Sequence, residues 1–218
     1  MTKKVRPKID KNIKRDKILY LHGFMSGANS MTVDRLDLKY GYIFEFVVPE
    51  LNGDIDHSIK IVNNIIAQEK PRMIIGSSLG GFYALVCDSG DIPVLVVNPC
   101  VNPHVHMQQY LNKTLEYHCK RRDGEVSYRL TQDVLEHFKK YDVVSAIKSK
   151  GAYLWALLST NDEILGTSHL DQFEKIREEE EVEESKKVFI STAQFGHRAF
   201  PWGIKHIDDL IYAILWDN

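Results

Sequence analysis

Residues 72–85, with the sequence RMIIGSSLGGFYAL, constrain the fold more than any other stretch of the chain. An apolar run meets a glycine-rich turn and then a segment suited to a helix, so the sequence predicts a strand, a sharp turn and a helix. Ser78 stands at the centre of a G-x-S-x-G pattern, between Gly76 and Gly80. A side chain at either glycine would collide with the opposing limb of so tight a turn. The turn would lift the Ser78 hydroxyl above the sheet, beside the free N–H groups of a helix N-terminus.

The same pattern has a simpler interpretation, as a glycine-rich turn or a loop that cradles a phosphate. No lysine follows the glycines as a P-loop requires, and the G-x-G-x-x-G pattern is absent. The strand and helix expected on either side are the context that a nucleophilic serine needs. The motif therefore favours Ser78 as a nucleophile.

Composition places the chain among ordinary globular proteins. Its 218 residues suffice for one large domain with a full core, and 44% hydrophobic and 27% charged residues are usual values. The net charge of −2 indicates no particular partner. The three cysteines are odd in number and lack metal-ligand spacing. With no recognisable signal peptide and no long apolar run, we expect a cytoplasmic protein that does not bind membranes.

Two charged segments are expected to be exposed. Residues 1–16 form a basic tail ahead of a single domain over residues 17–218. We expect a solvated terminus rather than a nucleic-acid-binding segment, because no aromatic residues interleave the basic charges. The acidic run within residues 178–184 is interpreted as a solvated helix end or loop.

Strand-like and helix-like segments alternate along the domain. Strands are expected at residues 17–21, 43–48, 73–75, 93–97, 152–158 and 187–191. The alternation predicts a six-stranded, mostly parallel sheet with right-handed crossovers and helices on both faces. An insertion over residues 102–141, rich in Tyr, His and basic residues, interrupts the pattern after the fourth strand. We expect this insertion to act as a lid.

A serine nucleophile needs a base to take its proton and a third group to orient that base. Ligands of open parallel sheets lie outside the carboxyl ends of the strands, so polar residues that follow strands are the candidates. Asp162 follows the fifth expected strand, and His197 follows the sixth. The chain order Ser78, Asp162, His197 is that of α/β-hydrolases, and it predicts this fold with a catalytic triad.

An oxyanion hole requires two N–H donors near the nucleophile. One would be the N–H of Leu79, and the other would come from the loop after the first strand, with Phe24 the first choice and Met25 the second. Gly23 and Gly27 would let that backbone approach a substrate closely.

Apolar side chains near these motifs are candidates for a substrate pocket, although ordinary core packing would explain most of them equally well. The candidates are Met25, Phe82, Phe195, Phe200 and Trp202. The histidines show no ligand spacing, so neither a metal nor a cofactor is expected.

Several motifs together resemble the YqiA-like esterases, which are small single-domain bacterial α/β-hydrolases. The motifs are LYLHGF, GSSLGGFYA, VVNP, STNDEIL and GHRAF, and the resemblance runs from about Ile18 to the C-terminus. It implies a carboxylic-ester hydrolase with Ser78 as nucleophile, Asp162 as acid and His197 as base. It also implies a minimal sheet without the first two strands of larger α/β-hydrolases.

We therefore expect a serine carboxylesterase that hydrolyses small or short-acyl esters through an acyl-enzyme. The shorter side chain and the resemblance favour Asp162 over the adjacent Glu163 as the acid. Two alternatives stay open. A thioesterase or peptidase would use the same residues, and a non-catalytic interaction module could use the same fold.

Overall fold

The computed structural model describes residues 14–179, 188–205 and 207–216. The basic tail expected over residues 1–16 and the acidic run over residues 178–184 lie mostly outside these ranges. None of the helices in the described ranges combines the length and the hydrophobicity that crossing a lipid bilayer requires.

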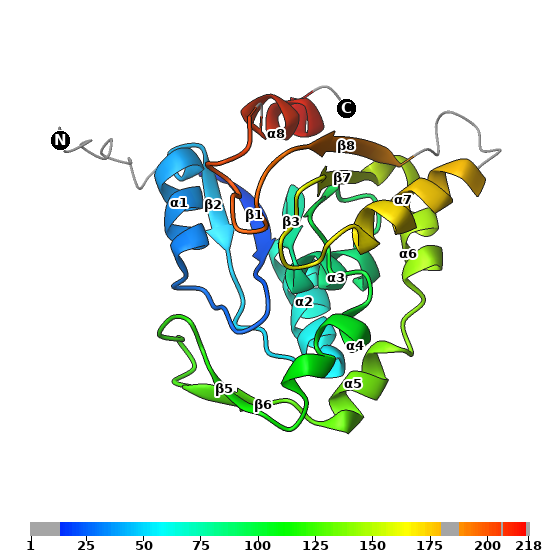
Figure 1. Cartoon of the computed structure of the whole chain (residues 1–218). Coiled ribbons are helices and arrows are strands. Elements are labelled where there is room, and N and C mark those ends of the chain that lie inside the picture. Colours follow the sequence, from blue (N-terminus) through cyan, green and yellow to red (C-terminus); the bar gives the residue numbers. More distant parts are fainter. Residues whose placement is uncertain (1–13, 180–187, 206, 217–218) are drawn as a thin grey trace.

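A six-stranded sheet in the order β2-β1-β3-β4-β7-β8 forms the centre of the molecule (Figure 1). Its strands are β1 (Asp16–Leu21), β2 (Phe44–Val47), β3 (Met73–Ser77), β4 (Val94–Val97), β7 (Leu154–Ser159) and β8 (Phe189–Ala193). Every neighbouring pair is parallel. The expected six-stranded sheet is confirmed; its last strand begins at Phe189, and residue 187 of the expected range lies outside the described residues.

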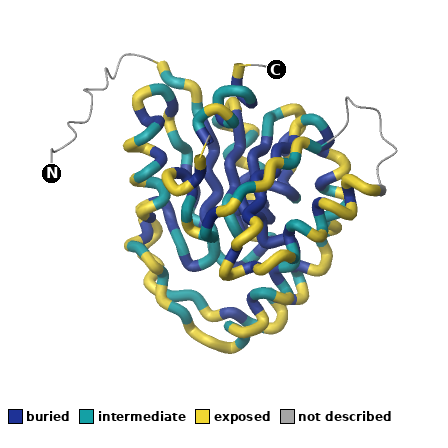
Figure 2. The backbone as a smooth tube through the Cα atoms, turned by 45° about the horizontal axis from the view of Figure 1, so that its top comes forward, coloured by how far each residue is buried: buried dark blue, intermediate teal, exposed yellow. Residues whose placement is uncertain are grey.

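Helices cover both faces of the sheet. On one face lie α1 (Met31–Tyr40) and α8 (Ile207–Trp216), and on the other lie α2 (Ile55–Glu69), α3 (Leu79–Val86), α6 (Val143–Lys150) and α7 (Ser168–Glu179). Strand β4 shows why both faces are covered, because Val94 and Val96 join one core while Leu95 and Val97 join the other. The buried strands run between more exposed outer segments in Figure 2.

Local signals explain where the helices begin and end. Helix α2 starts after Asp54, whose carboxylate accepts the N–H of His57 at 3.1 Å. It ends at Lys70, which adopts a left-handed conformation. Its buried side chains recur at helical spacing and include Ile55, Ile59 and Val62.

The insertion between β4 and α6 lies at the bottom of Figure 1. It contains α4 (Pro103–His106), the 3₁₀ turn η1 (Gln108–Tyr110), the antiparallel pair β5 (Thr114–Glu116) and β6 (Ser127–Arg129), and α5 (Gln132–Phe138). A second 3₁₀ turn, η2 (Gly151–Tyr153), leads from α6 into β7. Phe138 packs edge-on against Phe82 of α3, with ring centroids 5.4 Å apart, so the insertion shares the core of the domain.

Candidate active site

Ser78 occupies a strained turn between β3 and α3, with φ 55° and ψ −122°. A residue other than glycine held at positive φ costs about 1–3 kcal/mol, and such strain clusters at functional sites. A Cβ atom at Gly76 would lie 2.4 Å from the carbonyl oxygen of Gly80, as expected for a tight turn. A Cβ atom at Gly80 would instead lie 2.0 Å from the carbonyl oxygen of Leu21. Gly80 therefore allows the turn to pack closely against β1, and the nearest atoms that a side chain at Gly80 would meet belong to β1 and not to the opposing limb of the turn.

The side chains of Asp162 and His197 meet at the carboxyl ends of β7 and β8. His197 Nδ1 lies 2.6 Å from Asp162 Oδ2. Asp162 Oδ1 accepts the N–H groups of Ile164 at 2.9 Å and Leu165 at 2.7 Å. The Asp162 side chain is fully buried. Both oxygens of this carboxylate are thus committed to fixed donors.

The electrostatics of Asp162 define the tautomer of His197. Burial alone would raise the pKa of Asp162, but the hydrogen bonds from His197 and from the two backbone N–H groups outweigh burial and lower that pKa below its ordinary value. An ionised carboxylate can only accept, so the hydrogen lies on Nδ1 of His197. The other ring nitrogen, Nε2, is then the one able to accept a proton.

Glu163 contacts the same loop at a different atom. Its Oε2 accepts the backbone N–H of His197 at 2.9 Å. Glu163 therefore holds the main chain of the loop, while Asp162 holds the imidazole. The two adjacent carboxylates point to different groups, as expected for neighbours in a turn.

The loop after β1 lies against the Ser78 turn. A Cβ atom at Gly23 would be 3.3 Å from Ser78 Cβ, so a side chain there would crowd the serine. Within the described residues, the backbone N–H groups of Phe24 and Leu79 donate to no protein acceptor. Both expected oxyanion donors are therefore available to a ligand.

A cavity of about 340 Å³ brings these groups together. Ser78, Leu79, His197 and Phe24 all line it. The insertion supplies a further part of its wall, which includes His106, Met107, Tyr110 and Leu115. The insertion is thus placed to contact whatever the cavity binds.

The expected pocket side chains divide into two groups. Met25 and Phe200 line the cavity. The other three lie elsewhere: Phe82 and Phe195 are buried in the two hydrophobic cores, and Trp202 is 54% exposed. Phe82 faces Phe138 because α3 must cover the sheet, which turns this aromatic ring away from the cavity.

The two serines of the turn have different surroundings. Ser77 Oγ lies 2.8 Å from the hydroxyl of Tyr20 on the neighbouring strand. Burial raises the pKa of Tyr20 to about 12, so this phenol is neutral and can donate to Ser77. The Ser77 hydroxyl is therefore engaged with Tyr20.

Sequence reasoning assigned no role to Asn98 and Ser159, although both stand in motifs that suggested the family. Asn98 Oδ1 accepts the N–H of Ser159 at 2.7 Å. The buried Ser159 hydroxyl donates to the carbonyl of Phe195 and accepts the N–H of Asn161 at 2.9 Å. These bonds join the ends of β4, β7 and β8, and so connect the turn of Asp162 to the segment before His197. The only signal in the sequence is that Asn98 follows the fourth expected strand and Ser159 follows the fifth.

Comparison with solved structures defines the class of the fold. Est1E from Butyrivibrio proteoclasticus with bound ferulic acid has a TM-score of 0.61 at 11% identity, over 95% of this chain and 90% of that chain. A monoacylglycerol lipase from Paleococcus ferrophilus has a TM-score of 0.58 at 15% identity, over 93% and 95%. Alpha/beta hydrolase domain-containing protein 10 from mouse has a TM-score of 0.54 at 15% identity, over 94% and 89%. The chain has the α/β-hydrolase fold.

The family follows from the sequence itself. A model of the uncharacterised protein family UPF0227, the YqiA family, matches residues 17–189. The chain belongs to this family, and the resemblance inferred from its motifs is confirmed.

Proposed function

We propose that the protein is a serine carboxylesterase that acts on small or short-acyl esters. The observation that carries the proposal is the buried Asp162–His197 pair, which shares one cavity with Ser78 on its strained turn. Each of the three residues follows a different strand of a parallel sheet, at the end where sites on such sheets are built.

The proposed reaction begins when Ser78 Oγ attacks the ester carbonyl while His197 Nε2 takes the hydroxyl proton. The Asp162 carboxylate holds the imidazole in the required tautomer and stabilises its positive charge. His197 then gives the proton to the leaving alcohol, which departs and leaves an acyl-enzyme. A water molecule then gives a proton to His197 and attacks the acyl carbon. The bond to Ser78 Oγ breaks, His197 returns the proton to that oxygen, and the acid leaves.

The developing oxyanion would be held by the N–H groups of Leu79 and Phe24, with Met25 as the alternative second donor. The Leu79 N–H stands at the start of α3, where no intrahelical acceptor exists and the helix dipole favours negative charge. Losing one such donor typically costs about 3 kcal/mol of transition-state stabilisation. The reaction requires no metal or cofactor.

The similar folds include an esterase domain of a Rhodothermus marinus protein and the monoacylglycerol lipase, and these names support a hydrolase. The cavity supports a small substrate, since its volume of about 340 Å³ lies at the lower end of ligand pockets. A thioester could react with the same triad and oxyanion donors, because it differs from an ester only in having sulfur in place of oxygen in the leaving group.

A panel of acyl esters and matched acyl thioesters tests the proposal. We expect wild type to hydrolyse short-chain p-nitrophenyl esters, with a higher kcat/KM than for the thioester of the same acyl group. Ser78→Ala should abolish turnover of both series. A preference for thioesters would change the class to thioesterase, and no turnover of either series by folded protein would contradict the enzyme proposal.

The insertion is proposed to select the size of the substrate. The Tyr110 ring lines the cavity and lies 5.8 Å from the Phe24 ring, centroid to centroid. Tyr110→Ala should widen the cavity and raise kcat/KM for octanoate relative to acetate esters about 10-fold, the scale of small steric differences in apolar pockets. Steady-state kinetics on both esters measure this ratio.

Tyr153→Ala is the matched control for Tyr110→Ala. Tyr153 is 44% exposed, stands in η2 and does not line the cavity. Its substitution should leave the ratio unchanged. An unchanged ratio in Tyr110→Ala as well would show that this part of the insertion does not select substrates.

A further inference from the structure

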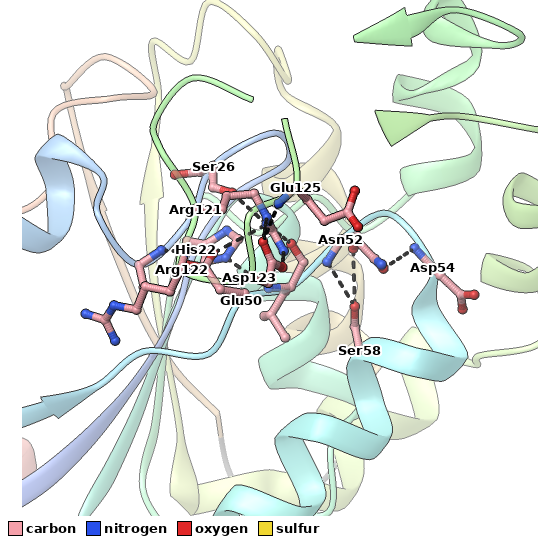
Figure 3. A network of polar contacts seen from close by, with 12 residues as sticks. His22, Ser26, Glu50, Asn52, Asp54, Ser58, Arg121, Arg122, Asp123 and Glu125 are labelled. Carbon is pink, nitrogen blue, oxygen red and sulfur yellow. Dashed lines mark hydrogen bonds and ion pairs between the residues drawn. The ribbon is translucent and has the colours of Figure 1, made fainter. Parts of the chain in front are cut away.

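Arg121 stands between β5 and β6 of the insertion, yet its side chain is only 2% exposed. Arginines are almost never so buried unless the charge and the donors are paired. Here the guanidinium has partners on every side. Nε donates to Asp123 Oδ1 at 3.1 Å, and the ring of Tyr117 lies 4.2 Å away, measured to its centroid. Figure 3 shows this side chain at the centre of a polar network.

Nη2 donates to Asp123 Oδ2 within the insertion, whereas Nη1 reaches out of it. Nη1 donates to the carbonyl of Leu51 at 2.7 Å and to the carbonyl of Ser26 at 3.2 Å. Leu51 belongs to the segment that follows β2. Ser26 belongs to residues 22–28, here called the oxyanion loop, because Phe24 and Met25 are its proposed donors. One buried cation thus joins three segments that are far apart in the sequence.

The backbone of the oxyanion loop needs such support. Met25 has a φ of 57°, a left-handed conformation that is strained for a residue with a long side chain. Strain of this kind persists only where surrounding contacts fix the backbone. The carbonyl of Met25 accepts the N–H of His118 at 2.8 Å, and the next carbonyl is the one that Arg121 binds. Both contacts come from the insertion.

Glu50 closes the network from the other side. Its Oε2 accepts the N–H of Ala28 at 3.2 Å and lies 3.5 Å from Arg121 Nη1, while its Oε1 accepts the N–H of Arg122 at 2.9 Å. A Cβ atom at Gly27 would lie 2.6 Å from Glu50 Oε2 and 3.2 Å from Arg121 Cγ. A glycine is therefore required there for the carboxylate and the guanidinium to reach the backbone.

His22 fixes the start of the same loop. Its Nε2 accepts the N–H of Leu51 at 3.2 Å, so the ring hydrogen lies on Nδ1, which is 2.9 Å from the carbonyl oxygen of Gly23. Burial lowers the pKa of His22, which keeps the ring in this neutral form. The oxyanion loop is thus attached to residues 50–51 at both ends, by His22 at its start and by Ala28 at its end. Arg121 is bonded to the same two residues.

We propose that Arg121 is a positioning residue for the oxyanion hole: from the insertion, it holds the strained loop that presents the second N–H donor. This inference rests on the proposed esterase function. An oxyanion exists in the transition state and not in the bound substrate, so a displaced donor lowers kcat more than it changes KM. The insertion then has a part in the chemistry as well as in substrate selection.

The test compares Arg121→Met, Arg121→Lys and Arg129→Met with wild type. Arg121→Met keeps an unbranched apolar stem as far as the position of Nε and removes the donors. We expect kcat on p-nitrophenyl acetate to fall about 10- to 100-fold, less than the 10²–10³-fold cost of deleting a donor outright, with KM changed less than about 3-fold. Arg121→Lys retains the charge and one or two donors, so its kcat should lie between those of Arg121→Met and wild type.

Arg129→Met is the matched control, because Arg129 is exposed on β6 of the same insertion. It removes the same charge and should leave kcat at the wild-type value. A wild-type kcat in folded Arg121→Met would overturn the proposal. So would an equal loss of kcat in Arg129→Met, or a loss confined to KM.

Amide hydrogen exchange separates this proposal from the esterase function. Residues 22–28 should exchange faster in Arg121→Met than in Arg129→Met, while the strands of the sheet stay protected. If wild type hydrolyses no ester, the proposed function fails, and the exchange rates still report whether Arg121 holds the loop. Unchanged exchange in residues 22–28 would overturn the positioning role whatever the activity.

Discussion

A serine-directed fluorophosphonate should label the wild-type protein once, at Ser78. Labelling should disappear in Ser78→Ala, which lacks the nucleophile, and in His197→Ala, which lacks the proposed base. Intact-protein mass spectrometry counts the adducts, and peptide mapping locates them. The expected loss of ester hydrolysis is about 10⁶-fold in kcat for either substitution, the scale found when a triad serine or histidine is removed.

Ser77→Ala supplies the control, because it removes a hydroxyl one residue away on the same turn. The Ser77 hydroxyl is engaged with Tyr20, so its loss should leave labelling at Ser78 intact. Labelling at Ser77 would contradict the assignment of the nucleophile. A folded wild-type protein that neither labels nor turns over any ester or thioester would favour an interaction module on the same fold.

Asp162→Asn should lower kcat by about 10⁴-fold, the effect known for the equivalent change in a serine protease triad. The amide can donate to His197 Nδ1, which would favour the tautomer that carries its hydrogen on Nε2 and cannot accept the serine proton. The fold should tolerate the change, because the amide oxygen can still accept the N–H groups of Ile164 and Leu165. Steady-state kinetics and thermal unfolding of the purified variant check both points.

Glu163→Gln is the matched partner of Asp162→Asn, since it makes the same chemical change one residue later. In wild type, Glu163 Oε2 accepts the backbone N–H of His197. The amide oxygen of glutamine can accept the same N–H group. We expect kcat to stay within about 3-fold of wild type, as for changes outside the reacting groups. The reverse ranking of the two variants would identify Glu163 as the acid.

The parts of the fold that could be predicted from sequence depend on short-range signals. Continuous apolar runs such as Val94–Val97 predict strands that are covered on both faces. The spacing of Ile55, Ile59 and Val62 predicts a helix. The proximity of Asp162 and His197 also follows from local features, because parallel strands bring their carboxyl ends to one edge. Local geometry also predicts that the adjacent Asp162 and Glu163 side chains point to different groups, whereas the preference for Asp162 comes from its shorter side chain and the family resemblance.

The substrate pocket could not be read from sequence, because its walls depend on contacts between distant segments. Phe82 stands beside the Ser78 motif, yet the packing of α3 on the insertion turns its ring into the core. Tyr110 lies within a polar insertion without strong periodicity, so nothing local marked it as a cavity residue. The buried state of Arg121 was equally hidden, since most arginines in such segments are solvated.

The Ser159 hydroxyl determines how the site unfolds, because it links the turn of Asp162 to the segment before His197. One buried oxygen bonds to the segment before His197 and to the turn of Asp162, and β8 is an edge strand that pairs only with β7 in the described sheet. Fraying of that edge would break the Ser159–Phe195 bond and detach the segment before His197 from the turn of Asp162. The lifetime of the paired imidazole and carboxylate is therefore set by the docking of a single peripheral strand. Warming should abolish the pair in one cooperative step while the central strands still exclude solvent.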